Sequence, residues 1–258
     1  TETELQSRIE KMSKSLGNVI NPDDVIADHG ADSFRLYEMF MGPLEQKKPW
    51  SSRGMEGVDR FLSRVWRLFT GEADTSNELS AGFLDPDVLK EPDADKKRNS
   101  ERIIHSTIKK VTEDIERLSF NTAISSMMIF VNEFFNEKRI GRFGTEAFIK
   151  LLSPFAPHIA EELWQRFQET VGMKASGTGS ILDESWPEYD EQKTAADEIE
   201  VVFQVNGKLR GRANVAPDIA ETDLKSIALE NDGVMRAMEG KEVRKIIVVK
   251  GKLVNIVI

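Results

Sequence analysis

Apolar residues recur at helical spacing through the middle of the chain, and this pattern is the strongest structural signal in the sequence. One broad stripe consists of Val58, Phe61, Leu62, Val65, Trp66, Leu68 and Phe69. Further apolar stripes follow over residues 104–118, 123–135 and 147–167, the last of them interrupted by prolines. Since each stripe must be buried against another element, residues 51–196 are predicted to form an antiparallel helix bundle.

Polar stretches separate or follow these helices. Residues 70–100 are rich in aspartate, glutamate, proline and glycine, which predicts a long connection between the first two helices. Residues 169–198 predict an irregular stretch followed by a linker.

Two short helices are predicted ahead of the bundle. Asn21 is placed to cap the first, which Pro22 begins and Gly30 ends, with two aspartates near its positive end. The second covers residues 32–41 and stops at a Gly-Pro pair. A domain boundary is therefore predicted near residue 50, which makes residues 1–50 a separate zone.

The last part of the chain changes to strand-type patterning. Two β-branched runs flank Asn206-Gly207, the dipeptide most typical of a tight hairpin. Helical segments near residues 221–230 and 234–239 follow, and two more strand-like runs then pair around Gly251. Residues 197–258 are predicted to be a small α+β domain with one sheet.

Composition excludes several classes of protein. No apolar run is long enough for a membrane helix and the first residues lack a signal sequence, so a cytoplasmic protein without a membrane partner is expected. The chain has no cysteine and its three histidines are scattered, which excludes a disulfide framework and a cysteine-ligated metal site. The net charge of −9 argues against a general polycationic nucleic-acid binder, and no DNA partner is expected.

The charge is unevenly distributed. From Asp197 onward ten lysines and arginines balance ten acids, so the whole negative excess lies earlier in the chain. Cations recur in this part at a spacing of two residues, at Lys208, Arg210 and Arg212 and again at Lys250 and Lys252. On a strand this spacing predicts that the cations share one face.

Near the N-terminus, the stretch KMSKSLGN places two lysines and two serines on a short loop, Lys11–Asn18, here called the lysine loop. Such a loop can neutralise a polyphosphate and donate hydrogen bonds to it. The alternative is a solvated surface turn, the ordinary role of a lysine-serine run.

The order of residues favours the first interpretation. KMSKS followed by Gly-Asn and a capped PDDV helix resembles the signature loop of the class I aminoacyl-tRNA synthetases. The resemblance implies that the loop closes over ATP, the substrate of the complete enzyme together with Mg²⁺. It makes Lys14 and then Lys11 the candidate catalytic contacts to the phosphates, with Ser13 and Ser15 shaping the ATP-binding loop and Met12 packing.

The resemblance covers nearly the whole chain. The segments KKVTEDIERLSFNTAIS, LSPFAPHIAEELW, VVFQVNGKLRGR and VVKGKLVNIVI look like the C-terminal part of a bacterial leucyl-tRNA synthetase. Isoleucyl- and valyl-tRNA synthetases share KMSKS and a helix bundle, but the last sixty or so residues resemble the leucyl family.

This resemblance implies a mainly α fold of three parts: the end of a Rossmann-type catalytic domain over residues 1–50, an anticodon-binding bundle over 51–196, and a tRNA-binding domain over 197–258. The implied partner is tRNA(Leu), held by the cations of the last domain. Another partner is the N-terminal catalytic and editing portion of the same enzyme.

Other candidates in the bundle have simple structural alternatives. Arg60, Arg64 and Arg67 lie on the first bundle helix and could follow tRNA phosphates, although exposed helical charges are usually only solvated. Trp66 and Trp164 are expected to pack in the core rather than to stack on bases. His158 lies near a helix start and is expected to cap or pack.

Several parts of a class I synthetase are not found in these residues. The chain contains no HIGH-type motif, leucine pocket or editing domain, and is predicted to be inactive alone and to bind no cofactor by itself. Three alternatives remain: a non-catalytic tRNA-binding or assembly module, the corresponding part of an isoleucyl- or valyl-type enzyme, and a helical adaptor with little support.

Overall fold

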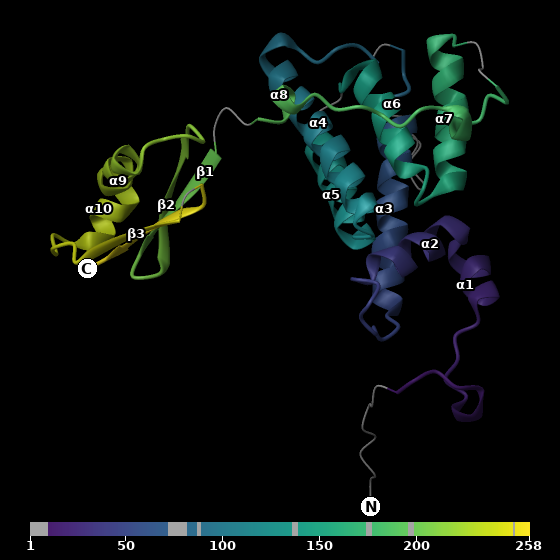
Figure 1. Ribbon diagram of the computed structural model, residues 1–258, viewed down its shortest axis with the longest axis horizontal. Coiled ribbons are helices and arrows are strands. Elements are labelled where there is room, and N and C mark those ends of the chain that lie inside the picture. Colours follow the sequence, from purple (N-terminus) through teal and green to yellow (C-terminus); the bar gives the residue numbers. More distant parts are fainter. Residues whose placement is uncertain are drawn as a thin grey trace, which may run out of the picture. The chain divides into compact units, whose positions relative to one another are not determined.

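The computed structural model describes residues 10–71, 82–86, 89–135, 139–173, 177–195, 199–249 and 251–258. The chain separates into two compact units, Thr1–Thr194 and Ala195–Ile258. The first unit is helical and the second is built on a small sheet, so the predicted fold class, mainly α with a small α+β part, is confirmed (Figure 1). Helices on both sides of residue 50 belong to the first unit, and the predicted division there stays a prediction.

The two predicted helices ahead of the bundle are present. They are α1 (Pro22–His29) and α2 (Ala31–Phe40). Asn21 caps α1 by accepting a hydrogen bond from the amide of Asp23 at 3.3 Å, and Pro22 occupies the first helical position. Gly30, with φ of 84°, separates the two helices, as the sequence pattern predicted.

The bundle is built from longer helices, as predicted. They are α3 (Ser52–Thr70), α4 (Ala94–Glu116), α5 (Phe120–Phe134), α6 (Gly141–Leu152) and α7 (Pro157–Val171). The prediction that residues 70–100 form one long connection is wrong at its end, because α4 begins at Ala94. Residues 95–99 are polar, and those whose side chains are described are solvent-exposed, so the first turns of α4 contribute no apolar stripe from which a helix could be recognised.

Aromatic rings fill the centre of the bundle. Phe148 of α6 stacks against Phe69 of α3 with ring centroids 5.4 Å apart and against Phe130 of α5 at 4.6 Å. Trp164 of α7 is fully buried, which confirms its predicted core position. Trp66 is only half-buried, and the Arg166 guanidinium lies 4.6 Å from its ring. Burial of large aromatic side chains of this kind supplies most of the stability of such a bundle.

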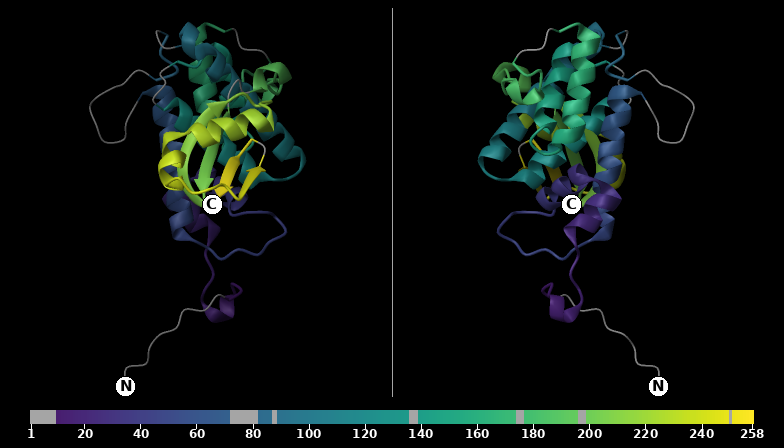
Figure 2. Two further views of the ribbon diagram at one scale, coloured as in Figure 1. Left: turned by 90° about the vertical axis from the view of Figure 1, so that its left-hand side faces the viewer. Right: turned by 90° about the vertical axis from the view of Figure 1, so that its right-hand side faces the viewer.

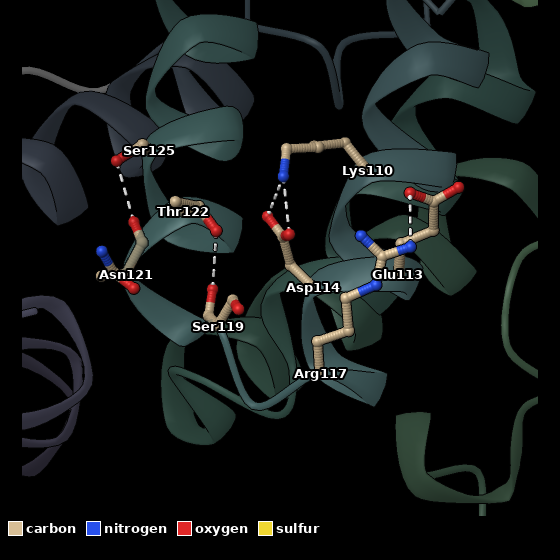
Figure 3. Close-up of polar contacts among 8 residues, drawn as sticks. All are labelled: Lys110, Glu113, Asp114, Arg117, Ser119, Asn121, Thr122 and Ser125. Atoms are coloured by element: carbon tan, nitrogen blue, oxygen red, sulfur yellow. Dashed lines mark hydrogen bonds and ion pairs between the residues drawn. The ribbon is translucent and has the colours of Figure 1, made fainter. Parts of the chain in front are cut away.

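A polar turn joins α4 to α5 (Figure 3). Both carboxylate oxygens of Asp114, a buried residue, accept hydrogen bonds from the Lys110 ammonium, at 2.6 and 2.7 Å. At the start of α5, the Thr122 hydroxyl donates to the carbonyl of Ser119 at 2.9 Å. The turn therefore satisfies its polar groups locally.

The stretch after α7 is more ordered than predicted. Residues 177–194, here called the strap, include η2 (Ile181–Asp183) and α8 (Glu191–Thr194), and run from α7 past α6 to α4 (Figure 1). The Trp186 indole donates to the Thr112 hydroxyl at 2.8 Å, and the Asp190 amide donates to Nδ1 of His105 at 3.1 Å. The described residues 177–194 are therefore attached to α4 by hydrogen bonds. Residues 169–171, which were predicted to be irregular, belong to α7, and residues 174–176 and 196–198 lie outside the described residues.

The second unit has one sheet of mixed direction. Its elements are β1 (Ile199–Val205), β2 (Lys208–Val215), α9 (Glu221–Glu230), α10 (Asp232–Met238), β3 (Lys245–Val249) and β4 (Leu253–Val257). The strand order is β2-β1-β4-β3, with antiparallel hairpins at both edges and a parallel pair, β1 and β4, in the centre. Both predicted hairpins are confirmed, and Asn206 and Gly207 adopt the positive φ angles, 50° and 77°, of a type I′ turn.

Within the described residues of the second unit, α9 and α10 cover one face of this sheet. Val201, Phe203 and Val254 are buried in a core with residues of α9 and α10, and Figure 2 shows both helices against the same side of the strands. The residues that alternate with Val201, Phe203 and Val254 along the strands point to the other face and are half-buried or exposed.

No helix in the described ranges is long and apolar enough to cross a membrane.

Candidate functional site

The lysine loop has a defined shape that the Asn18 side chain closes. Its amide oxygen accepts a hydrogen bond from the Ser13 amide at 2.8 Å, and its amide nitrogen donates to the Lys11 carbonyl at 3.3 Å. These two hydrogen bonds of Asn18 are here called the Asn18 clasp. Within the loop that the clasp closes, residues Lys14–Leu16 form a single 3₁₀ turn that ends at Gly17, whose φ is 65°. Gly17 is required there because a residue with a Cβ adopts this conformation at a cost.

The clasp presents its cations outward. Lys11 and Lys14 are both exposed, and neither forms an ion pair with any residue in the described part of the chain. The hydroxyls of Ser13 and Ser15 lie 2.6 Å apart and hydrogen-bond to each other. The predicted ATP-site residues are therefore brought together on one short loop, with two free ammonium groups and two hydroxyls.

Met12 connects the loop to the helices behind it. With Lys48 and Trp50, and with Ile20, Pro22, Phe34, Glu38 and Met41, it lines an apolar pocket of about 170 Å³. Met12 itself is 41% exposed, so the packing role predicted for it stays a prediction. Burial against these apolar groups raises the pKa of Glu38.

Two carboxylates attach the helices that follow the loop to the bundle, that of the buried Asp32 and that of the half-buried Asp59. Asp32 of α2 accepts hydrogen bonds from the amide of Ile159 at 2.8 Å and from Nδ1 of His158 at 2.8 Å. It therefore caps α7 from another helix. His158 was expected to cap or pack, but its side chain is 74% exposed, and its ring only hydrogen-bonds to the capping carboxylate. His29 of α1 hydrogen-bonds to Asp59 of α3 at 2.6 Å. These contacts attach the helices next to the lysine loop to the helix bundle. No sequence signal predicted that the two carboxylates would make them.

A β-bulge changes the predicted arrangement of cations in the second unit. Val205 pairs with Lys208 and Val202 pairs with Arg212, and the register shifts between these pairs, where Arg210 is the extra residue. Since Val205 is buried and Val202 lies on the open face, Lys208 and Arg212 belong to opposite faces. The prediction that spacing of two places them on one face is wrong.

The structure also separates these cations by their partners. Arg212 forms an ion pair with Glu200 on the neighbouring strand, at 3.1 Å. Lys208, Arg210 and Lys252 are exposed and form no ion pair with the residues described. Lys250, the remaining candidate, lies outside the described residues.

The sheet face that carries Arg212, opposite to α9 and α10, is partly apolar. A row across the four strands consists of Arg212, Val202, Leu253 and Val249, and the exposed Ile247 lies one pair further along. A face of this composition can contact flat or apolar groups while cations at its edge contact phosphates.

The bundle arginines have local partners. Arg60 lies 3.7 Å from Glu56 in an exposed pair of the same helix. The guanidinium groups of Arg64 and Arg67 both lie over the ring of Phe135, at 4.8 and 5.6 Å from its centroid. This shared contact is not predictable from the sequence, because Phe135 follows α5 and no local pattern links it to α3. The three arginines remain exposed, and their role in binding stays a prediction.

Comparisons with known proteins agree with this arrangement. Residues 98–226 match the family model described as the anticodon-binding domain of tRNA ligase, and residues 5–50 match the model described as tRNA synthetases class I (I, L, M and V).

A similar solved structure is agnB2 LeuRS of Agrobacterium radiobacter K84, crystallised as a ternary complex with tRNA and LeuAMS. It is 28% identical in sequence to this chain, with a TM-score of 0.67. The similarity covers 96% of this chain, which spans only 31% of that one.

Proposed function

The chain belongs to the class I aminoacyl-tRNA synthetases through its tRNA ligase anticodon-binding domain, and on this basis we propose that it serves leucylation of tRNA(Leu). In this proposal the lysine loop contacts the phosphates of ATP, bound with Mg²⁺, while the bundle and the second unit bind the tRNA. The observation that carries it is that both family models match one chain, with a LeuRS–tRNA complex similar over nearly all of it.

The lysine loop has the chemistry that leucine activation requires. When the leucine carboxylate attacks the α-phosphate, negative charge develops on phosphate oxygens and on the leaving pyrophosphate. The exposed ammonium groups of Lys14 and Lys11 can neutralise this charge, and the Asn18 clasp holds them on a loop whose shape is already set. Loss of one preorganised donor of this kind typically costs about 3 kcal/mol of transition-state stabilisation.

A chimeric enzyme tests this role. This chain would replace the matching segment of the Agrobacterium enzyme, and leucine-dependent exchange between ATP and pyrophosphate would be measured. Lys14→Ala should lower the rate about a hundredfold or more. The matched control is Lys47→Ala, which removes an exposed lysine outside the lysine loop. Equal rates for both variants would remove Lys14 from the proposed mechanism.

The second unit carries cations that have no acidic partner among the described residues and are therefore available to bind tRNA phosphates. Lys208, Arg210 and Lys252 have no acidic partner among the described residues, whereas Arg212 is already paired with Glu200. Each lysine or arginine that neutralises a phosphate contributes to the salt dependence of binding, because counterions are released. Arg60, Arg64, Arg67 and Lys250 are further candidate contacts of the same kind.

Binding of the chain to tRNA(Leu) over a series of salt concentrations tests this surface. Replacing Lys208, Arg210 and Lys252 together with glutamine should weaken binding and reduce the slope of log K against log salt by about 2 to 3. Arg212→Gln alone should change the slope less. Unchanged affinity in the triple variant would exclude this surface as the tRNA site.

The identity of the amino acid, leucine, is a separate part of the proposal. The model matched by residues 5–50 covers isoleucine, leucine, methionine and valine enzymes together, so an isoleucyl- or valyl-type enzyme is the alternative. Selective binding of tRNA(Leu) over tRNA(Ile), which lacks a long variable arm, would support the leucyl assignment. Equal binding of both would support a less specific tRNA-binding or assembly module.

A further inference from the structure

A second pocket, of about 180 Å³, lies between α6 and the strap, away from the lysine loop. Its lining consists of Phe143, Glu146, Ala147 and Lys150 from α6 and of Ser185, Trp186, Pro187 and Glu188 from the strap. The α6 residues are three or four positions apart and therefore share one helical face, which the strap crosses. A pocket of this size accommodates one side chain or a small molecule of similar size rather than a nucleotide.

Two exposed aromatic rings form walls of this pocket, and both are held in place. Phe143 is 45% exposed, and the ring of His105 stacks on it with centroids 5.2 Å apart and an interplanar angle of 29°. Trp186 is 37% exposed, and its indole nitrogen donates to the Thr112 hydroxyl at 2.8 Å. Both rings that line the pocket are therefore held by contacts to α4, with little conformational freedom to lose when a ligand binds.

Acidic groups dominate the charge around these rings. The one ammonium in the lining, that of the buried Lys150, lies 2.7 Å from Glu146 and 3.2 Å from Glu184, so its charge is already offset. Glu188 is exposed and forms no ion pair with any residue in the described ranges. One ammonium and three carboxylates leave a local excess of negative charge.

We propose that this pocket binds an alkylguanidinium group, the head group of an arginine side chain. A guanidinium is planar and weakly hydrated, and it stacks on aromatic faces while hydrogen-bonding to a carboxylate in its plane. Phe143 and Trp186 supply the faces, and Glu188 supplies the carboxylate. The excess negative charge would repel an anion. The inference does not depend on the proposed synthetase function.

Titration of the chain with n-butylguanidinium tests the site, with n-butylurea as a neutral molecule of nearly the same shape. The Trp186 indole N–H signal, assigned from its loss in Trp186→Phe, is followed by NMR. The expected result is a saturable shift of this signal with butylguanidinium and none with butylurea. Equal shifts with both molecules, or no saturable shift with either, would overturn the proposal.

Matched variants separate charge from stacking. Glu188→Gln should raise the dissociation constant about threefold or more, and Phe143→Leu by a similar factor, because each removes one exposed contact. Glu133→Gln, at an exposed site on α5, should leave it unchanged. Both substituted residues are exposed, so the variants should fold, and circular dichroism of each variant without ligand checks this. An unchanged dissociation constant in Glu188→Gln and Phe143→Leu would also overturn the site.

A capped arginine, acetyl-arginine-amide, identifies the source of the cation. Binding at least as tight as that of butylguanidinium assigns the pocket to an arginine of a peptide or protein. Weaker binding assigns it to a free small cation, and either result supports the guanidinium chemistry.

Discussion

The carboxylate of Asp32, at the start of α2, accepts a hydrogen bond of 2.8 Å from the amide of Ile159, in the first turn of α7. The residue is 9% exposed, and the same carboxylate also accepts a hydrogen bond from the His158 ring. Because the N-terminus of a helix carries free amides and partial positive charge, a buried carboxylate there is stabilising. This contact links the helices that carry the lysine loop to the bundle.

Asp32→Ala should therefore destabilise the first unit. Removing a charged acceptor from buried amides typically costs about 2 kcal/mol, which urea unfolding followed by tryptophan fluorescence would measure. Asp28→Ala is the matched control, because Asp28 is an exposed acid on the preceding helix. Equal effects of the two variants would show that the Asp32 cap contributes nothing.

Asn18→Ala should open the lysine loop. The variant loses both hydrogen bonds that join Asn18 to Ser13 and Lys11, each typically contributing about 1 kcal/mol. Cleavage by trypsin after Lys11 and Lys14, followed by mass spectrometry, should become about fivefold faster or more as the open form becomes more populated. Asn132→Ala, on the exposed face of α5, should leave this rate unchanged. No acceleration would mean that the clasp does not hold the loop.

Acidification should weaken the attachment of the strap. Burial lowers the pKa of His105, with the nearby charge of Lys193 acting in the same direction, while Asp190 and Glu101 oppose the shift. Since Nδ1 of His105 accepts the Asp190 amide, the folded chain favours the neutral ring. The unfolded chain then binds the proton more readily, so stability is complete above the ordinary pKa of about 6.5 and falls as pH decreases below it.

Urea unfolding at pH values from 8 to 5 measures this effect. His105→Gln keeps an acceptor for the amide but cannot titrate in this range, so its stability should depend less steeply on pH than that of the native chain. Identical slopes would contradict the assignment to His105.

Gly233→Ala should destabilise the second unit alone. A Cβ at this position would lie 1.9 Å from the carbonyl oxygen of Arg210, where α10 crosses β2 at the bulge. The Arg210 carbonyl is a backbone group and the Cβ position is fixed by the backbone of α10, so relief requires the helix to move, with an expected loss of about 2 kcal/mol. All four tryptophans precede residue 195, so circular dichroism should detect the change and tryptophan fluorescence should not.

Gly57→Ala in α3 is the control for Gly233→Ala. The nearest atom to a Cβ there is the end of the Arg60 side chain, at 3.9 Å, so the added methyl group meets open space. This change should be neutral or slightly stabilising, because alanine favours the helix. Equal stability of Gly233→Ala and the native chain would show that the crossing tolerates a side chain.

Most elements were predictable because their signals are local. Asn21, Pro22 and Gly30 mark the two ends of α1 within a stretch of ten residues. The dipeptide Asn206-Gly207 alone marks the turn of the first hairpin. The strap was missed for the opposite reason. It is polar and aperiodic, and its order depends on single contacts such as Trp186 to Thr112, which are 74 residues apart.

The sequence by itself determined the order of helices and strands, the bundle stripe, the lysine loop and the family that these segments resemble. Local propensities and apolar periodicity are set by neighbouring residues, so they can be read in order along the chain. Only the tertiary structure decided that Asp32 caps α7, that Lys208 and Arg212 face opposite ways, and that Phe143 of α6 and Trp186 of the strap line one pocket. These outcomes depend on packing and on a one-residue bulge, which brings together or separates residues that no local pattern connects.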